Sequence, residues 1–76
     1  MPLSRPLSGK EVVRAFEALS WEVARQKGSH IIMTKEGHIA TLSVPDHREV
    51  AKGTLRSLIR SAGLTVSEFE NAVRRR

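Results

Sequence analysis

The hydrophobic positions along the chain change from helical spacing to strand spacing and back. The first stretch has apolar residues at three- and four-residue intervals, namely Val12, Val13, Phe16 and Leu19. This spacing is typical of an α-helix with one buried face. Just before it, Ser8 and Glu11 form a capping box, in which the serine hydroxyl accepts from the Glu11 amide while the carboxylate reaches back. We therefore expect a helix that starts at this box.

From Trp21 onward the pattern consists of short segments separated by glycine. The segments are 21–26, 29–35 and 38–44, and Lys27-Gly28 and Glu36-Gly37 lie between them. Turns of this kind join antiparallel strands, so the pattern predicts a three-stranded antiparallel meander. Pro45 has no amide hydrogen to donate and should end the third strand.

The register of the second hairpin decides which face each strand residue occupies. A strict two-residue loop pairs Met33 with Ala40 and Ile31 with Leu42. A three-residue loop instead places Ile32 opposite Ala40. One extra loop residue would turn His30 to the other face of the sheet. Both registers remain open from the sequence.

The second half of the chain returns to helical spacing. A helix should open near Gly53-Thr54 and close at Gly63, with the apolar stripe Leu55, Leu58, Ile59 and Ala62. A second capping box from Thr65 to Glu68 should begin a short third helix, whose apolar side is Phe69, Ala72 and Val73. The predicted class is α+β, with the helices on one face of the sheet and the other face open to solvent.

Length and charge narrow the range of partners. We expect one domain over residues 1–76, with a core of about 7–73 and basic tails at 1–6 and 74–76. Thirteen Lys and Arg against eight Asp and Glu give a net charge of +5, which favours a polyanionic partner. So short a chain cannot enclose a large cofactor, and no cofactor is expected. Trp21, the only tryptophan, is assigned to the core.

Targeting and metal-binding signals are sparse. There is no cysteine, and no spacing of His, Asp or Glu suggests a metal site. The first six residues lack the apolar segment of a secretory signal, and no apolar run approaches the ~20 residues that span a bilayer. We expect a soluble, cytoplasmic protein without a membrane partner.

One turn gathers several groups suited to phosphate chemistry. Arg25, Lys27, Ser29 and His30 lie within six residues. Histidine side chains, with an ordinary pKa of about 6.5, can accept or donate a proton in phosphoryl transfer. Arginine or lysine could neutralise the charge that develops on the phosphate. A histidine in a strand is nevertheless more often structural, so this cluster alone is a weak signal.

The sequence indicates the roles of the two other histidines less clearly. His47 follows Val44-Pro45-Asp46 and could be a second proton-transfer group, a phosphate contact or an ordinary loop residue. His38 begins a predicted strand beside Gly37 and has no chemical neighbours nearby in sequence. We expect it to be exposed and inert.

A second basic region lies at the start of the predicted second helix. Lys52, Gly53 and Thr54 precede its apolar stripe, where unpaired amides and the helix dipole favour a phosphate. Arg56 and Arg60 extend this basic edge along the helix. The alternative is an ordinary solvated helix face.

Several segments, taken in order, closely resemble the HicA toxin family over about residues 7–73. The two most specific are the Lys27-Gly28-Ser29-His30 turn and the Lys52-Gly53-Thr54-Leu55-Arg56 helix start. The others are Ser8 to Val12, Trp21, Val44 to His47, Ser57 to Ile59 and Ala62 to Leu64. Ser20 is a departure, because the family usually has glycine between the first helix and the aromatic residue.

The resemblance implies a toxin of a type II toxin–antitoxin pair, acting as a ribosome-independent mRNA interferase. It implies a fold similar to double-stranded RNA-binding domains, and a HicB antitoxin that binds and blocks the toxin. The family's catalytic histidine falls on His30, and His47 matches a recurrent Val-Pro-x-His position. We expect metal-independent RNA cleavage, with Ser29, Arg25 and Lys27 in support. The alternative is a non-catalytic RNA-binding module of the same fold.

Overall fold

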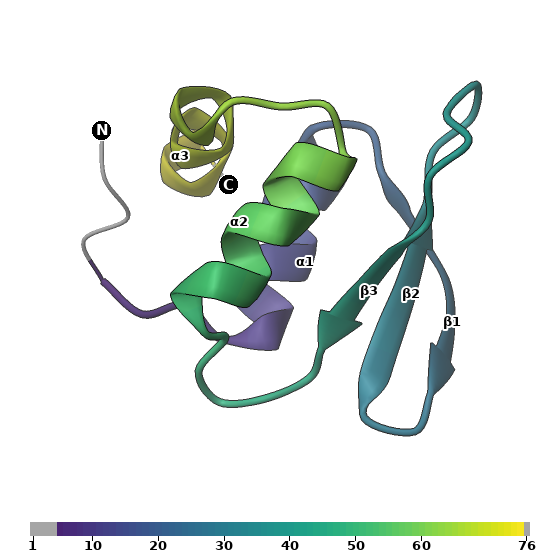
Figure 1. Cartoon of the computed structure of the whole chain (residues 1–76), viewed down its shortest axis with the longest axis horizontal. Helices are drawn as coiled ribbons and strands as arrows, with labels where there is room; N and C mark the ends of the chain where they lie inside the picture. Colours follow the sequence, from purple (N-terminus) through teal and green to yellow (C-terminus); the bar gives the residue numbers. More distant parts are fainter. Residues whose placement is uncertain (1–4, 76) are drawn as a thin grey trace.

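Three helices and a three-stranded antiparallel sheet make up residues 5–75, the part of the chain that this computed structural model describes. The elements follow the order α1 (Gly9–Ala18), β1 (Glu22–Lys27), β2 (His30–Thr34), β3 (Leu42–Pro45), α2 (Lys52–Ser61) and α3 (Val66–Arg75) (Figure 1). The predicted α+β class and element order are therefore confirmed. Residues 1–4 and 76, which belong to the predicted basic tails, lie outside the described residues. Arg74 and Arg75 are not part of a tail, because they form the last turn of α3.

Both predicted capping boxes are present. The Glu11 amide donates to the Ser8 hydroxyl at 3.1 Å, and the Ser8 amide donates to the Glu11 carboxylate at 3.0 Å. At the start of α3, the Glu68 amide donates to the Thr65 hydroxyl at 3.1 Å, and the Thr65 amide donates back to Glu68 at 2.8 Å. Gly63 follows α2 with φ at +74°, a left-handed conformation that favours glycine. Local sequence signals thus fix where these helices start and stop.

The third strand is shorter than the prediction of 38–44. It runs from Leu42 to Pro45, and residues 35–41 form a connection much longer than two or three residues. Pro45 ends the strand as predicted. Met33 lies opposite Leu42 in place of Ala40, so neither predicted pairing is correct. The loop of this hairpin is therefore longer than the turn predicted at Glu36-Gly37.

The faces of the sheet nevertheless agree with the two-residue alternative. The observed register differs from it by two residues, and a shift of two leaves each side chain on the same face. Ile31 and Met33 on β2 and Val44 on β3 are buried, whereas His30 is exposed on the opposite face. The sheet order is β1-β2-β3. We call the face that carries His30 the open face.

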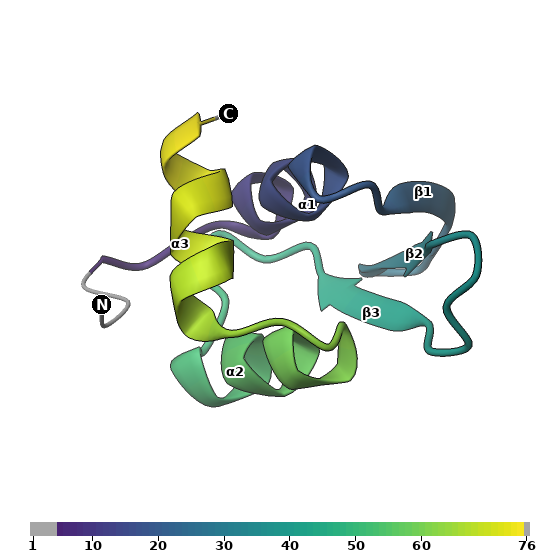
Figure 2. The same cartoon turned by 90° about the horizontal axis from the view of Figure 1, so that it is seen from above.

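The core lies between the sheet and the helices. Figure 2 shows α1 and α2 on the same side of the sheet, with α3 crossing their ends away from the strands. Phe16, Trp21 and Phe69 are among its largest fully buried side chains, so Trp21 is a core residue as expected. The rings of Phe16 and Phe69 pack with centroids 5.0 Å apart. Within residues 5–75, no helix is both long and apolar enough to cross a membrane.

Candidate functional site

A tight turn places His30 at the edge of the open face. Lys27 pairs with His30 across β1 and β2, which leaves Gly28 and Ser29 as the turn residues. Gly28 has φ at +61°, so this turn needs a residue that tolerates the left-handed region. The glycine therefore sets the abrupt reversal that brings the two strands together beside the histidine.

The open face carries a groove with two cations beside His30. Arg25 pairs with Ile32, and Lys27 pairs with His30, so these side chains share one face of the sheet. The full lining is Arg25, Lys27, His30, Ile32, Thr41 and Ser43. We call this the open-face groove. The structure thus brings together three of the residues singled out in the sequence.

His47 joins the same site from the connection between β3 and α2. The rings of His30 and His47 have centroids 6.5 Å apart and are inclined by 61°. Both residues are exposed, and neither imidazole has a hydrogen-bond partner within residues 5–75. Sequence alone could not place them together, because the rest of β2, the connection 35–41 and β3 separate them along the chain. The structure therefore places two solvent-accessible imidazoles side by side.

Backbone hydrogen bonds tether the segment around His47 to two elements. The Asp46 amide donates to the Ser29 carbonyl oxygen at 2.7 Å, and the Gly9 amide donates to the His47 carbonyl oxygen at 2.9 Å. Ser29 thus contributes its backbone to the site. The start of α1 and the β1–β2 turn are therefore both hydrogen-bonded to residues 46–47.

Gly9 makes this tether sterically possible. A Cβ atom built at this position would overlap the Pro45 carbonyl oxygen and lie 2.9 Å from the Asp46 Cα. Any larger residue would push α1 away from residues 45–47. In the sequence, Gly9 stands out only as part of the capping box segment 8–11, because nothing local signals this long-range contact.

The side chain of Asp46 also contacts the elements around His47. The sequence did not indicate this role for Asp46. Its carboxylate lies 3.5 Å from the Lys10 Nζ and accepts from the Gln26 Nε2 at 3.4 Å. Gln26 also donates to the Gly28 carbonyl oxygen at 3.3 Å. The three residues are distant in sequence, so no motif could have indicated them.

The second basic region is separate from the histidines. Lys52, Gly53 and Thr54 are exposed at the start of α2, and the N-cap residue Ala51 supplies no side-chain hydrogen bond. Amides in the first turn therefore lack a side-chain acceptor and suit an anion. Figure 1 places this helix start at the far end of the connection from the β1–β2 turn.

Arg56 and Arg60 do not line the open-face groove. They line another hollow beside the end of α2 and the start of α3, together with Ile59, Gly63, Leu64 and Val66. The structure therefore places the predicted basic residues in three parts of the surface, namely the open-face groove, the start of α2 and the hollow at its end. Of these basic residues, only Arg25 and Lys27 line the open-face groove with His30.

His38 differs from its prediction. It is half-buried, and its ring packs on that of Trp21 with centroids 5.0 Å apart. Its Nδ1 accepts a hydrogen bond from the Ala40 amide at 3.2 Å. The expectation that His38 is exposed was wrong, because packing on Trp21, a contact that the local sequence does not indicate, covers part of the ring.

Comparison with known proteins assigns the family. The family model described as HicA toxin of bacterial toxin–antitoxin matches residues 9–64, which run from the start of α1 to the loop after α2. A search of curated proteins gives no significant match. The matched segment includes both His30 and His47 and covers well over half of the chain. The protein therefore belongs to the HicA family of toxins from bacterial toxin–antitoxin systems.

Proposed function

We propose that this toxin is an endoribonuclease that cleaves mRNA in the open-face groove, with His30 as a proton-transfer group. The observation that carries the proposal is the exposed His30 ring, which shares a groove with Arg25 and Lys27 and faces the ring of His47. The family assignment adds the biological setting of a toxin. Its action on mRNA would take place in the cytoplasm.

Two imidazoles at this separation can serve one phosphodiester. Each hydrogen bond to a reacting oxygen spans about 3 Å, and the ring centroids are 6.5 Å apart. One histidine removes the proton from the ribose 2′-OH, whose oxygen then attacks the adjacent phosphorus in line. The other protonates the departing 5′ oxygen. The products are a 2′,3′-cyclic phosphate and a 5′-OH end.

Two fixed cations stand beside the reacting groups. Arg25 and Lys27 line the groove with His30 and can stabilise the negative charge that grows on the phosphoryl oxygens in the transition state. Both proton transfers and the charge stabilisation are thus assigned to protein side chains. On this account the reaction needs no metal ion.

The remaining basic residues are assigned to binding. The exposed amides and side chains of Lys52, Gly53 and Thr54 can hold a phosphate remote from the scissile bond. Arg56 and Arg60, on their separate hollow, add electrostatic attraction for the RNA backbone. The partner that neutralises the toxin is assigned as a HicB antitoxin, and an acidic surface on it would complement the net charge of +5.

Substitution of His30 by glutamine tests the catalytic role against simple RNA binding. His30→Gln should fold and bind RNA with parental affinity, but its cleavage rate should fall by about 100-fold or more because proton transfer is lost. Thr34→Gln is a matched control, since Thr34 is exposed near the other end of the same strand. Rates come from a fluorescent RNA substrate, and affinities from fluorescence anisotropy.

The outcome separates the two functions. A folded His30→Gln that still cleaves at the parental rate would remove His30 from the mechanism. A parent protein that binds RNA without cleaving it would make the chain an RNA-binding module. A parent protein with no RNA affinity at moderate salt would exclude both.

A further inference from the structure

The Asp46 side chain connects α1 with β1. Its Oδ1 lies 3.5 Å from the Lys10 Nζ, and its Oδ2 accepts from the Gln26 Nε2 at 3.4 Å. Asp46 is only partly exposed, with about a quarter of its side chain accessible. It immediately precedes His47, so the carboxylate and the imidazole are carried by neighbouring residues.

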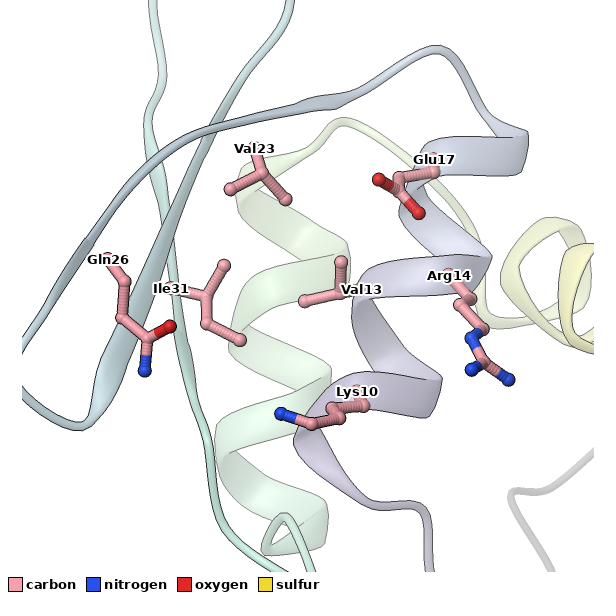
Figure 3. Close-up of a pocket in the computed structure, with 7 residues that line it drawn as sticks. All are labelled: Lys10, Val13, Arg14, Glu17, Val23, Gln26 and Ile31. Atoms are coloured by element: carbon pink, nitrogen blue, oxygen red, sulfur yellow. The ribbon is translucent and has the colours of Figure 1, made fainter.

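Lys10 and Gln26 reach this carboxylate from opposite walls of a groove between α1 and β1. Figure 3 shows the Lys10 ammonium and the Gln26 amide extending toward each other at the same end of this groove. Val13, Val23 and Ile31 form its apolar part. A carboxylate bridging the two polar groups therefore spans the gap between the first helix and the first strand.

Contacts of Asp46, through both its backbone and its side chain, connect the segment of His47 with the turn that precedes His30. Neither ring is held by a hydrogen bond within residues 5–75. The location of His47 is therefore set by its backbone, and Asp46 ties that backbone to the turn before His30 through the Ser29 carbonyl oxygen. Gln26 also binds the turn through the Gly28 carbonyl oxygen. Through Gln26, the Asp46 side chain therefore adds a second link between the segment of His47 and the turn of His30.

We propose that Asp46 is a positioning residue, whose carboxylate holds the segment of His47 and the turn of His30 at the separation needed for proton transfer. The inference rests on the proposed ribonuclease function of the same site. Asp46 touches no reacting atom on this account and acts through the two histidines. A small misplacement of such groups is enough to slow a reaction substantially.

A different role for the same carboxylate predicts the opposite kinetic change. An acidic group beside an RNA-binding groove repels the substrate, so its removal would strengthen binding and raise kcat/KM. Loss of positioning instead lowers kcat and leaves KM nearly unchanged. The direction of the change therefore distinguishes a positioning residue from a merely repulsive charge.

The experiment compares Asp46→Ala and Asp46→Asn with Glu49→Ala. Glu49 is exposed in the same connection and has no ion pair or hydrogen bond within residues 5–75, so its removal changes net charge equally without breaking a contact. Asp46→Ala should lower kcat about 10-fold with little change in KM. Asp46→Asn keeps an acceptor for Gln26 but loses the charge that faces Lys10, so its loss should be smaller.

A spectroscopic measurement makes the test independent of activity. Long-range ¹H–¹⁵N spectra of the imidazoles, recorded without RNA, should show shifted signals for His30 and His47 in Asp46→Ala. The signals of His38 should stay in place, because its ring packs on Trp21 at the other end of the sheet. Glu49→Ala should leave all three histidines unchanged.

The outcomes keep the two proposals apart. Lower kcat together with shifted His30 and His47 signals supports the positioning role. Unchanged kcat, or a rise in kcat/KM that matches Glu49→Ala, overturns it. If the parent protein fails to cleave RNA, the ribonuclease proposal falls, and the imidazole spectra alone then decide whether Asp46 positions the histidines.

Discussion

Two histidines near opposite ends of β2 differ in their exposure to solvent. At one end, His30 follows a two-residue turn, is exposed, and faces His47 across 6.5 Å. At the other end, residues 35–41 form a wide connection, and His38 folds back so that its ring packs on Trp21. The same residue type is thus presented to solvent in one place and used for packing in the other.

The difference lies in the chain around each residue. The two-residue turn at Gly28-Ser29 pairs His30 with Lys27, and the alternation of side chains along β2 places His30 on the open face, opposite to buried Ile31. The wider connection lets His38 reach the edge of the core, where its Nδ1 accepts from Ala40. Ile39 beside it is fully exposed. Loop length and distant neighbours, more than residue type, decide what each histidine can do.

Substitutions of single histidines test this comparison. Among them, His47→Gln should have the largest effect on the cleavage rate. Loss of the second proton-transfer group should lower kcat by about 100-fold, with little change in the free energy of unfolding because the ring is exposed. Stopped-flow or gel-based cleavage kinetics and urea denaturation measure the two quantities. A His47→Gln variant with parental kcat would leave His30 acting without this partner.

His38→Gln is the matched counterpart in that experiment. It should keep the parental kcat and lose about 1 kcal/mol of stability, since an aromatic pair with Trp21 is removed. If instead His38→Gln lost activity while remaining folded, the separation between the two ends of the sheet would be wrong.

Gly9→Ala tests the backbone contact between α1 and the segment that carries His47. The added Cβ would overlap the Pro45 carbonyl oxygen, and relieving this overlap should cost about 1–3 kcal/mol of stability. The urea midpoint should fall accordingly. Gly53→Ala is the control, because no atom lies near its Cβ position, and it should gain up to about 1 kcal/mol in helix propensity. Equal stability of the two variants would contradict the close approach of α1 to residues 45–47.

Local signals predicted much of the fold. The capping boxes at Ser8 and Thr65, the stop at Gly63 and the strand end at Pro45 all depend on residues within a few positions of one another. The hydrophobic periods likewise predicted the helix faces that pack in the core. Such features are readable from sequence because their cause is short-range.

Features with long-range causes were missed or left open. The pairing of Met33 with Leu42 depends on the shape of residues 35–41, and periodicity does not specify that shape. The packing of His38 on Trp21 and the close approach of Gly9 to Pro45 likewise join distant segments. For the site, the turn at His30 was visible in the sequence, whereas its proximity to His47 was not.

The most direct test of the account uses an RNA substrate with a single 2′-deoxyribose at the scissile nucleotide, incubated with the parent protein in EDTA. The account predicts that the all-RNA substrate is cut to 2′,3′-cyclic phosphate and 5′-OH ends, while the deoxy substrate stays intact because the attacking 2′-oxygen is missing. Cleavage of the deoxy substrate at that position, or activity that strictly requires a divalent ion, would contradict it.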